Sequence, residues 1–132
     1  VKNLLSDEVE GVEIVKVDIF ENLWNFTGWG KFDLVISNPP YISEKDMENL
    51  EPEVKKEPIS SLYGGLLGID FYLRIADKVK TFISNRGKII LEVGDDEQAE
   101  LVKEVFKLKG FRNFLKFKDL SNQTRGIVIF NF

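Results

Sequence analysis

The chain of 132 residues contains no cysteine and no histidine, and only one methionine. Without cysteine there is no disulfide and no thiolate chemistry, which fits a reducing compartment and predicts a cytoplasmic protein. Without histidine the chain lacks the commonest metal ligand and the commonest general base. We therefore expect no metal site, and any catalytic mechanism has to work without either residue.

Long apolar runs and a strong charge bias are also missing. No segment approaches the ~18 consecutive apolar residues of a membrane span, and no signal peptide is recognisable. The formal net charge of −4 argues against a broad basic surface for nucleic acid. A late group of basic residues is best interpreted as a solvated helix face and strand edge: Lys103, Lys107, Lys109, Arg112, Lys116 and Lys118.

What the chain does contain is an alternation of strand and helix patterns typical of one α/β domain. Strands are expected at residues 12–17, 32–37, 88–93, 111–118 and 127–132, and helices at 69–84 and 97–108. This order predicts a mostly parallel sheet with helices on both faces. The short link between the last two strands requires one of them to run antiparallel, at the edge of the sheet or inserted into it.

The most informative residues are Asn38, Pro39, Pro40 and Tyr41, which directly follow the apolar strand at 32–37. In open α/β sheets, ligands bind at the carboxyl ends of the strands. The prolines donate no backbone hydrogen bonds, so carbonyls stay free to accept from a ligand. Asn38 adds an acceptor and two donors, and Tyr41 adds a flat ring. Together they could hold a planar, neutral NH2 group with its nitrogen lone pair exposed.

The simpler alternative is an ordinary Pro-Pro turn in which Asn38 is a turn former. The complete Asn-Pro-Pro-Tyr sequence after an apolar strand is more specific than that. It resembles the catalytic motif of S-adenosylmethionine (AdoMet)-dependent methyltransferases that modify planar amino nitrogens.

The resemblance extends over nearly the whole chain. Further matching segments occur in the same order: Glu57-Pro58, Leu62-Tyr63-Gly64-Gly65, Gly68-Ile69-Asp70-Phe71-Tyr72, residues 87–94, Lys118-Asp119-Leu120 and Arg125. This combination resembles the HemK/PrmC protein-(glutamine-N5) methyltransferases, which act on release factors. The resemblance implies a Rossmann-like AdoMet-dependent methyltransferase fold, a three-layer α/β/α arrangement with an antiparallel C-terminal strand, here truncated at its N-terminus.

The same resemblance implies a role for each site residue. Asn38 and the carbonyl of Pro39 would accept the two hydrogens of the target glutamine amide, within a turn completed by Pro40. Tyr41 would pack on the amide plane. Asp18 would hold the adenine amino group of AdoMet, with the N–H of Ile19 facing the ring, and Asn38 would also contact the cofactor. Without the resemblance, Asp18 would be interpreted as a loop-capping carboxylate, and a structural and a functional role for Glu92 are equally open.

The chain also departs from the family pattern. Leu66-Leu67 stand where the family usually has an acidic residue after the Gly-Gly pair. No Gly-x-Gly-x-Gly turn for AdoMet precedes Asn38. We therefore interpret residues 1–132 as the C-terminal part of a methyltransferase domain that lacks the glycine turn and the substrate-recognition domain. Such a piece is expected to be inactive and to bind AdoMet weakly at best. It is also expected to self-associate, because the strand at 12–17 would lack its neighbours.

Three functions remain open from the sequence. The first is methylation of the Gly-Gly-Gln glutamine of a peptide-chain release factor. The second is methylation of adenine-N6 or guanine-N2 in a nucleic acid, where Tyr41 would stack on a flipped base; the acidic net charge makes a nucleic-acid partner unlikely. The third is a non-catalytic fragment with a structural or interaction role.

Overall fold

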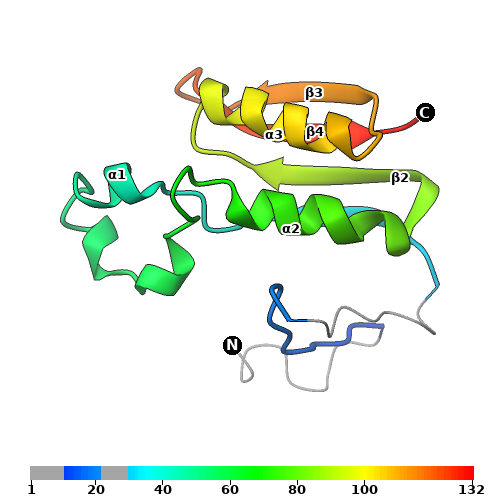
Figure 1. The fold of residues 1–132 in the computed structure, drawn as a ribbon, viewed down its shortest axis with the longest axis horizontal. Coiled ribbons are helices and arrows are strands. Elements are labelled where there is room, and N and C mark those ends of the chain that lie inside the picture. The colour runs from blue at the N-terminus through cyan, green and yellow to red at the C-terminus, as the bar shows by residue number, and fades with distance from the viewer. Residues whose placement is uncertain (1–10, 22–29) are drawn as a thin grey trace.

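The computed structural model describes residues 11–21 and 30–132 and shows one four-stranded sheet within them (Figure 1). The strands are β1 (Phe32–Ser37), β2 (Ile83–Glu92), β3 (Asn113–Lys118) and β4 (Thr124–Phe130). The helices are α1 (Glu44–Met47), α2 (Asp70–Lys78) and α3 (Asp96–Leu108). Short 3₁₀ turns occur at Val54–Lys56, Ile59–Ser61 and Val79–Thr81.

The strands lie in the order β1-β2-β4-β3. β1 is parallel to β2, whereas β4 is antiparallel to both of its neighbours, β2 and β3. Three strands therefore point the same way, and the C-terminal strand is inserted between two of them in the opposite direction. This confirms the predicted Rossmann-like arrangement, including the antiparallel pairing of the last two strands.

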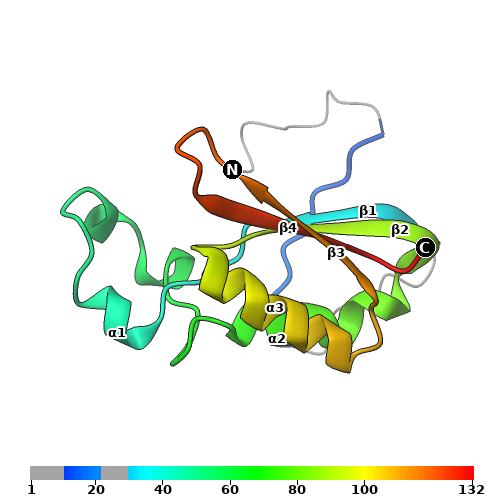
Figure 2. The ribbon, with the colours of Figure 1, turned by 90° about the horizontal axis from the view of Figure 1, so that it is seen from above.

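Helices cover only one face of the sheet among the described residues. α2 connects β1 to β2 and α3 connects β2 to β3, so both connections advance in the same direction across the sheet. Right-handed crossovers that advance in one direction place their helices on the same side, as Figure 2 shows. The described residues thus supply two of the three expected layers, and the expectation of helices on both faces is not met within them.

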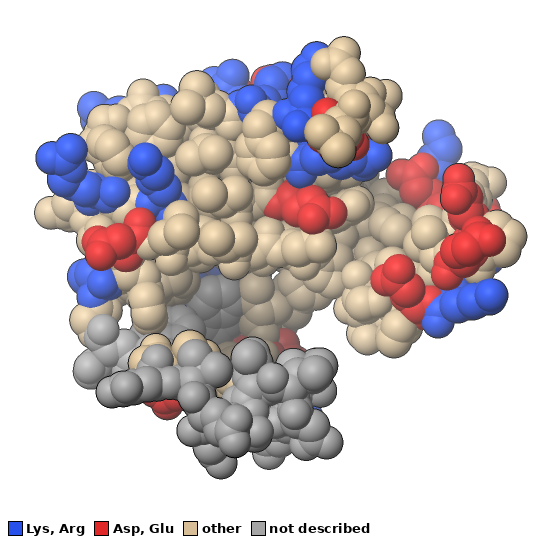
Figure 3. Space-filling view, turned by 180° about the vertical axis from the view of Figure 1, so that it is seen from behind, with Lys and Arg blue, Asp and Glu red and all other residues tan. Residues whose placement is uncertain are grey.

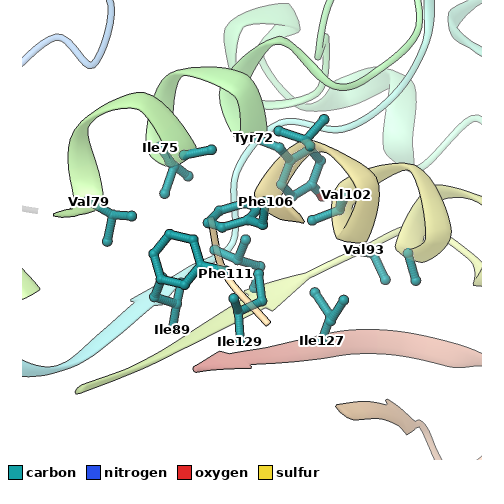
Figure 4. Packing of buried hydrophobic residues seen from close by; sticks show 14 of the residues in the cluster. Tyr72, Ile75, Val79, Ile89, Val93, Val102, Phe106, Phe111, Ile127 and Ile129 are labelled. Atoms are coloured by element: carbon teal, nitrogen blue, oxygen red, sulfur yellow. The ribbon is translucent and has the colours of Figure 1, made fainter. Parts of the chain in front are cut away.

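The core lies between these two helices and the sheet (Figure 4). Ile89 and Leu91 of β2 point toward the helices, as do Ile127 and Ile129 of β4, and all four are fully buried. Their alternation along each strand reflects the two-residue period of a strand. From the helices, the side chains that meet them are Tyr72, Ile75, Ala76, Ala99, Val102, Val105 and Phe106.

The opposite face of the sheet, which we call the open face, is apolar but exposed. Leu34 and Ile36 of β1 are 50% and 67% exposed, and Leu115 and Phe117 of β3 are 60% and 44% exposed. Figure 3 views the molecule from this side and shows a largely uncharged surface. An apolar patch of this kind on a folded domain is typical of a surface that is covered by another part of a protein.

Two expected elements differ from the structure. The helix expected at 69–84 ends as α2 at Lys78, and β2 begins at Ile83 and contains Asn85, Arg86 and Gly87. The register with β1 shifts between Phe32 and Leu34, so residues 84–87 bulge out of the ladder. Bulges admit glycine and turn-forming residues into a strand, which is why a sequence signal typical of a helix stop lies inside β2.

The strand expected at 12–17 is wrong: these residues form no strand in the structure, and the sheet described has four strands instead of five. A strand needs a neighbouring backbone to pair with. In the fold of the methyltransferases that the chain resembles, two further strands would separate this segment from β1. The segment is therefore not expected to pair with β1. Val12, Ile14 and Val15 are consequently exposed.

The turn between β3 and β4 depends on one carboxylate. Asp119 Oδ1 accepts from the N–H groups of Ser121 (2.8 Å) and Gln123 (3.0 Å), and Oδ2 accepts from Arg125 Nε at 2.9 Å. The Gln123 N–H, followed by the Arg125 guanidinium, lowers the pKa of Asp119 below its usual value.

This arrangement predicts a pH-dependent contribution of Asp119 to stability. Because its pKa is lower in the folded state, the contribution is complete above the unfolded pKa of about 3.9 and is lost as pH falls through the folded value. We expect Asp119→Asn to lower the free energy of unfolding at pH 7 and the difference from the unsubstituted chain to shrink below about pH 4. Urea unfolding at a series of pH values measures this, and a difference independent of pH would contradict it.

Candidate active site

The four predicted site residues from Asn38 to Tyr41 lie at the carboxyl end of β1. Ser37 pairs with Leu91, so the following residues, Asn38 and Glu92, end two neighbouring parallel strands. Asn38 is exposed, Pro39 is buried, and Pro40 and Tyr41 are half-buried. The turn therefore presents the Asn38 side chain outward at the edge where α/β sheets bind their ligands.

A cleft of about 330 Å³ opens at this edge on the open face of the sheet. Asn38, Glu92 and Arg125 provide its polar groups, and Ile36, Ile90 and Phe117 provide its apolar wall. The tip of the Phe117 ring occupies the space that a Cβ on Gly126 would take. The cleft thus combines a neutral amide, a carboxylate and a guanidinium around an apolar surface, as small polar substrates require.

Tyr41 and Glu92 are linked across the two strand ends. The Tyr41 hydroxyl donates to Glu92 Oε1 at 3.2 Å, and the Tyr41 ring lies against Gly94. Burial raises the pKa of the Tyr41 phenol, and the Glu92 carboxylate raises it further. Tyr41 therefore stays neutral near neutral pH and offers a fixed aromatic surface. Glu92 is a structural partner of Tyr41 and a lining residue of the cleft at the same time, so both roles left open by the sequence have support.

The Leu-Tyr-Gly-Gly segment packs directly against the turn. Ile42 N–H donates to Leu62 O and Gly64 N–H donates to Ile42 O, both at 2.9 Å. A Cβ atom on Gly64 would lie 2.7 Å from the Pro40 carbonyl oxygen, and one on Gly68 would overlap the Tyr41 carbonyl oxygen. The glycines are therefore needed because the backbone of this loop runs against the backbone of the Asn38–Tyr41 turn.

Asp18 and Ile19 lie in a turn that is anchored to α2. Asp18 Oδ1 accepts from the Phe20 N–H at 2.8 Å, as a loop-capping carboxylate does. Arg74 of α2 donates to the carbonyls of Ile19 (2.8 Å) and Glu21 (3.1 Å), and the Phe20 ring meets the Phe71 ring edge-on at 4.8 Å. The cofactor role of Asp18 and Ile19 stays a prediction.

A second cleft, of about 340 Å³, lies along β1. Ile19, Ile75 and Phe82 line it together with residues of β1, and Ile36 and Ser37 border both clefts. The second cleft is mainly apolar. Ile19 thus lines the second cleft and Asn38 lines the first.

The other residues singled out by the sequence have simple placements. Leu66 and Leu67 are exposed. Most of the late basic residues pair with acids, as a solvated face would: Lys103 with Glu100, Lys107 with Glu104, Lys109 with Asp77, and Lys116 with both Asp96 and Glu100. No cluster of Asp and Glu that could hold a metal ion occurs in residues 11–21 and 30–132. Within the same part of the chain, no helix has the length and apolarity needed to cross a membrane.

Sequence reasoning missed two residues that contact this region. Arg74 anchors the Asp18–Glu21 turn, and Gln98 contacts the backbones of Tyr41, Gly68 and Gly94. Both lie on otherwise amphipathic helices, where a polar residue is usually solvated. No local pattern distinguishes Arg74 and Gln98 from solvated residues, because most of their partners are 20 or more positions away in sequence. The exception is Gly94, which is four positions from Gln98.

Comparison with known proteins identifies the family. The family description "Eco57I restriction-modification methylase" matches residues 2–132. The chain belongs to this family of methyltransferases. Its resemblance to the HemK/PrmC release factor glutamine methyltransferases is also confirmed, since curated relatives with that name share up to 43% identity with it.

Three of the most similar proteins illustrate the match. The release factor glutamine methyltransferase of Aquifex aeolicus is 43% identical over 98 residues, which cover 74% of this chain and 34% of the relative. The bifunctional methyltransferase of Rickettsia felis is 36% identical over 118 residues, which cover 89% of this chain and 21% of the relative. A methyltransferase structure from Pyrococcus furiosus aligns with a TM-score of 0.51 at 21% identity, covering 77% of this chain and 42% of that one.

The matched region is only part of the length of each relative. The chain spans about a third of the length of the release factor methyltransferases that it matches. The structural likeness to the Pyrococcus protein supports the Rossmann-like methyltransferase fold of the chain.

Proposed function

We propose that this chain is the C-terminal part of an AdoMet-dependent methyltransferase domain that methylates the glutamine of the Gly-Gly-Gln loop of a peptide-chain release factor in the cytoplasm. The observation that carries the proposal is the placement of Asn38 and Glu92 side by side at two strand ends, lining one cleft, with the Tyr41 hydroxyl bonded to Glu92. The identity of 43% to a release factor glutamine methyltransferase supports the choice of substrate.

The chemistry follows from the properties of an amide. An amide nitrogen is a weak nucleophile, so the enzyme gains most from orienting it. The Asn38 side-chain oxygen accepts one N–H of the target amide and the Pro39 carbonyl accepts the other, which directs the nitrogen along one line of approach. Tyr41 packs against the amide plane, and its neutral phenol avoids adding a charge beside it. Bound AdoMet would supply the methyl group as a sulfonium electrophile.

The described residues fit the adenine end of AdoMet and no more of it. Asp18 Oδ1 accepts from the Phe20 N–H, and its second carboxylate oxygen could accept from an amino group. Ile19 lines the apolar wall against which a flat ring could lie. The family's glycine turn for the methionine part has no counterpart before Asn38 in this chain.

The second candidate is methylation of an adenine or guanine amino group. The name of the matched family favours it, and a base could stack on Tyr41. Against it stand the net charge of −4 and the pairing of Lys103, Lys107 and Lys116 with acids, which reduces the positive charge that the late basic residues offer to phosphates. We therefore favour the protein substrate.

The test of this proposal uses the longer protein that carries this segment. The purified protein is incubated with AdoMet and, in parallel, with a Gly-Gly-Gln peptide, a Gly-Gly-Asn control peptide, DNA and RNA. Methylation of the glutamine peptide alone, located by mass spectrometry, supports the proposal. Methylation of an adenine or guanine instead would favour the second candidate over this proposal. If none of the four substrates is modified, the result favours a non-catalytic role.

For the 132-residue chain by itself we expect no methyl transfer, no micromolar binding of AdoMet, and self-association. The outer edge of β1, which pairs with no further strand among residues 11–21 and 30–132, and the exposed apolar residues of the open face are the surfaces that would associate. Sedimentation measures the self-association, and calorimetry measures the binding of AdoMet. We expect Ile36→Lys, on the edge strand β1 of the open face, to shift the chain toward monomer, whereas Leu108→Lys, exposed at the end of α3, leaves its association unchanged. A monomer that binds AdoMet at micromolar concentration would contradict the expectation.

A further inference from the structure

Gln98, in the first turn of α3, makes more contacts around the Asn38–Tyr41 turn than any pattern in the sequence indicates. Its Nε2 donates to the carbonyl oxygens of Tyr41 at 2.8 Å and Gly68 at 3.1 Å. Its Oε1 accepts from the N–H of Gly94 at 2.8 Å. One carboxamide therefore joins the turn after β1, the loop before α2 and the turn after β2.

The orientation of this carboxamide is fixed by its partners. The NH2 group faces two carbonyls and the oxygen faces an N–H, so the flipped amide would place like groups against one another at all three contacts. The helix start is fixed as well, because Asp95 caps α3 by accepting from the Gln98 N–H at 2.7 Å. A residue held in this way can transmit a defined position from α3 to the turn.

Together with Glu92, Gln98 holds Tyr41 at both ends. Gln98 binds the Tyr41 carbonyl, and Glu92 accepts from the Tyr41 hydroxyl at 3.2 Å. Glu92 is itself the last residue of β2, and Gln98 is tied to the turn that follows because it accepts from the N–H of Gly94. The Arg125 guanidinium donates to the carbonyl of the same Gly94. The distance between the Asn38 turn and the end of β2 is therefore set by side chains rather than by the sheet alone.

We propose that Gln98 is a positioning residue for methyl transfer: its carboxamide fixes the backbone of the Asn38–Tyr41 turn against the end of β2, so that Asn38 and the Pro39 carbonyl hold the acceptor amide in line. The proposal rests on the proposed function. It does not require Gln98 to contact substrate or cofactor, and its effect reaches the site through the Tyr41 backbone.

Two substitutions separate the contacts. Gln98→Glu keeps an oxygen for the Gly94 N–H but replaces the donor to Tyr41 and Gly68 with an acceptor. Gln98→Met keeps the length and removes both kinds of contact. Gln123→Glu makes the same chemical change at an exposed glutamine in the β3–β4 turn and serves as the control.

In the longer protein, assayed well below its melting temperature, we expect both Gln98 variants to lower kcat on the Gly-Gly-Gln peptide by about 10- to 100-fold, because misplacing reacting groups by a fraction of an ångström has effects of this order. The AdoMet dissociation constant should stay within about twofold, since the expected adenine contacts come from Asp18 and Ile19, whose turn is held by Arg74 and not by Gln98. Hydrogen exchange at the Gly94 amide should accelerate in Gln98→Met and stay slow in Gln98→Glu. Gln123→Glu should match the unsubstituted protein in each measurement.

An unchanged kcat in Gln98→Glu with an active parent would overturn the proposal, as would a loss of activity that disappears when the assay temperature is lowered, because that pattern indicates only reduced stability. An inactive parent overturns the proposed function and with it the catalytic role of Gln98. The exchange measurement then still shows whether Gln98 holds Gly94, which separates the two failures.

Discussion

Replacing Asn38 with alanine in the longer protein is expected to lower the turnover of a Gly-Gly-Gln substrate by about 100-fold, with the AdoMet dissociation constant within about twofold of its original value. Asn38 is exposed at the carboxyl end of β1 and lines the cleft with Glu92, so its removal leaves the fold intact. What is lost is an acceptor that positions the target amide. An interaction of this kind acts on the transition state more than on the binding of the cofactor.

The measurement is a steady-state assay combined with calorimetric titration of AdoMet. Asn49→Ala provides a matched control, because Asn49 is an exposed asparagine in the loop after α1 and should leave both constants unchanged. An equal loss of turnover and cofactor affinity in Asn38→Ala would assign Asn38 to the cofactor site. Unchanged turnover would favour the ordinary Pro-Pro turn.

Replacing Gly68 with alanine is expected to destabilise the protein and to disturb the site at the same time. Gly68 has φ +72°, and a Cβ there would overlap the carbonyl oxygen of Tyr41. The left-handed conformation costs about 1–2 kcal/mol for alanine, and the overlap with fixed backbone adds about 1–3 kcal/mol. The overlap can be relieved only by moving the Tyr41 backbone, so turnover should fall as well.

Gly30→Ala separates the two contributions. Gly30 has φ +77°, close to that of Gly68, but a Cβ there meets nothing within 4 Å. We expect it to lower the free energy of unfolding by about 1–2 kcal/mol, through the backbone conformation alone, with normal turnover. Urea unfolding and the peptide assay compare the two variants. Equal effects at both positions would mean that the loop before α2 yields to the added methyl group without moving the turn.

The strand that leads to the site was predicted with its exact limits, and the reason is local. Residues 32–37 are an apolar run that ends at Asn38-Pro39-Pro40, and a proline cannot continue a ladder, so sequence alone sets the end of β1. The helix α3 was predicted within one residue of its start because its apolar residues follow a helical period. The motif and its place at a strand end therefore follow from short-range rules.

The boundary between α2 and β2 could not be predicted in the same way. Residues 79–82 continue the helical apolar pattern, but Phe82 accepts a hydrogen bond from the Phe32 N–H at 2.8 Å, which draws the chain into the sheet. The same limitation applied to residues 12–17, whose alternation indicates a strand although no partner strand lies beside them in the structure. In both cases the outcome depends on a segment distant in sequence.

The sequence by itself thus determined the family, the order of the main elements, and the identity of the residues at the end of β1, because each depends on composition or on neighbours a few positions apart. The tertiary structure alone decided that Glu92 and Arg125 share a cleft with Asn38, that Gln98 ties the turn to the end of β2, and that both long helices lie on one face. These are consequences of strand order and register, which bring together side chains up to 87 positions apart, and no local pattern encodes such a distance.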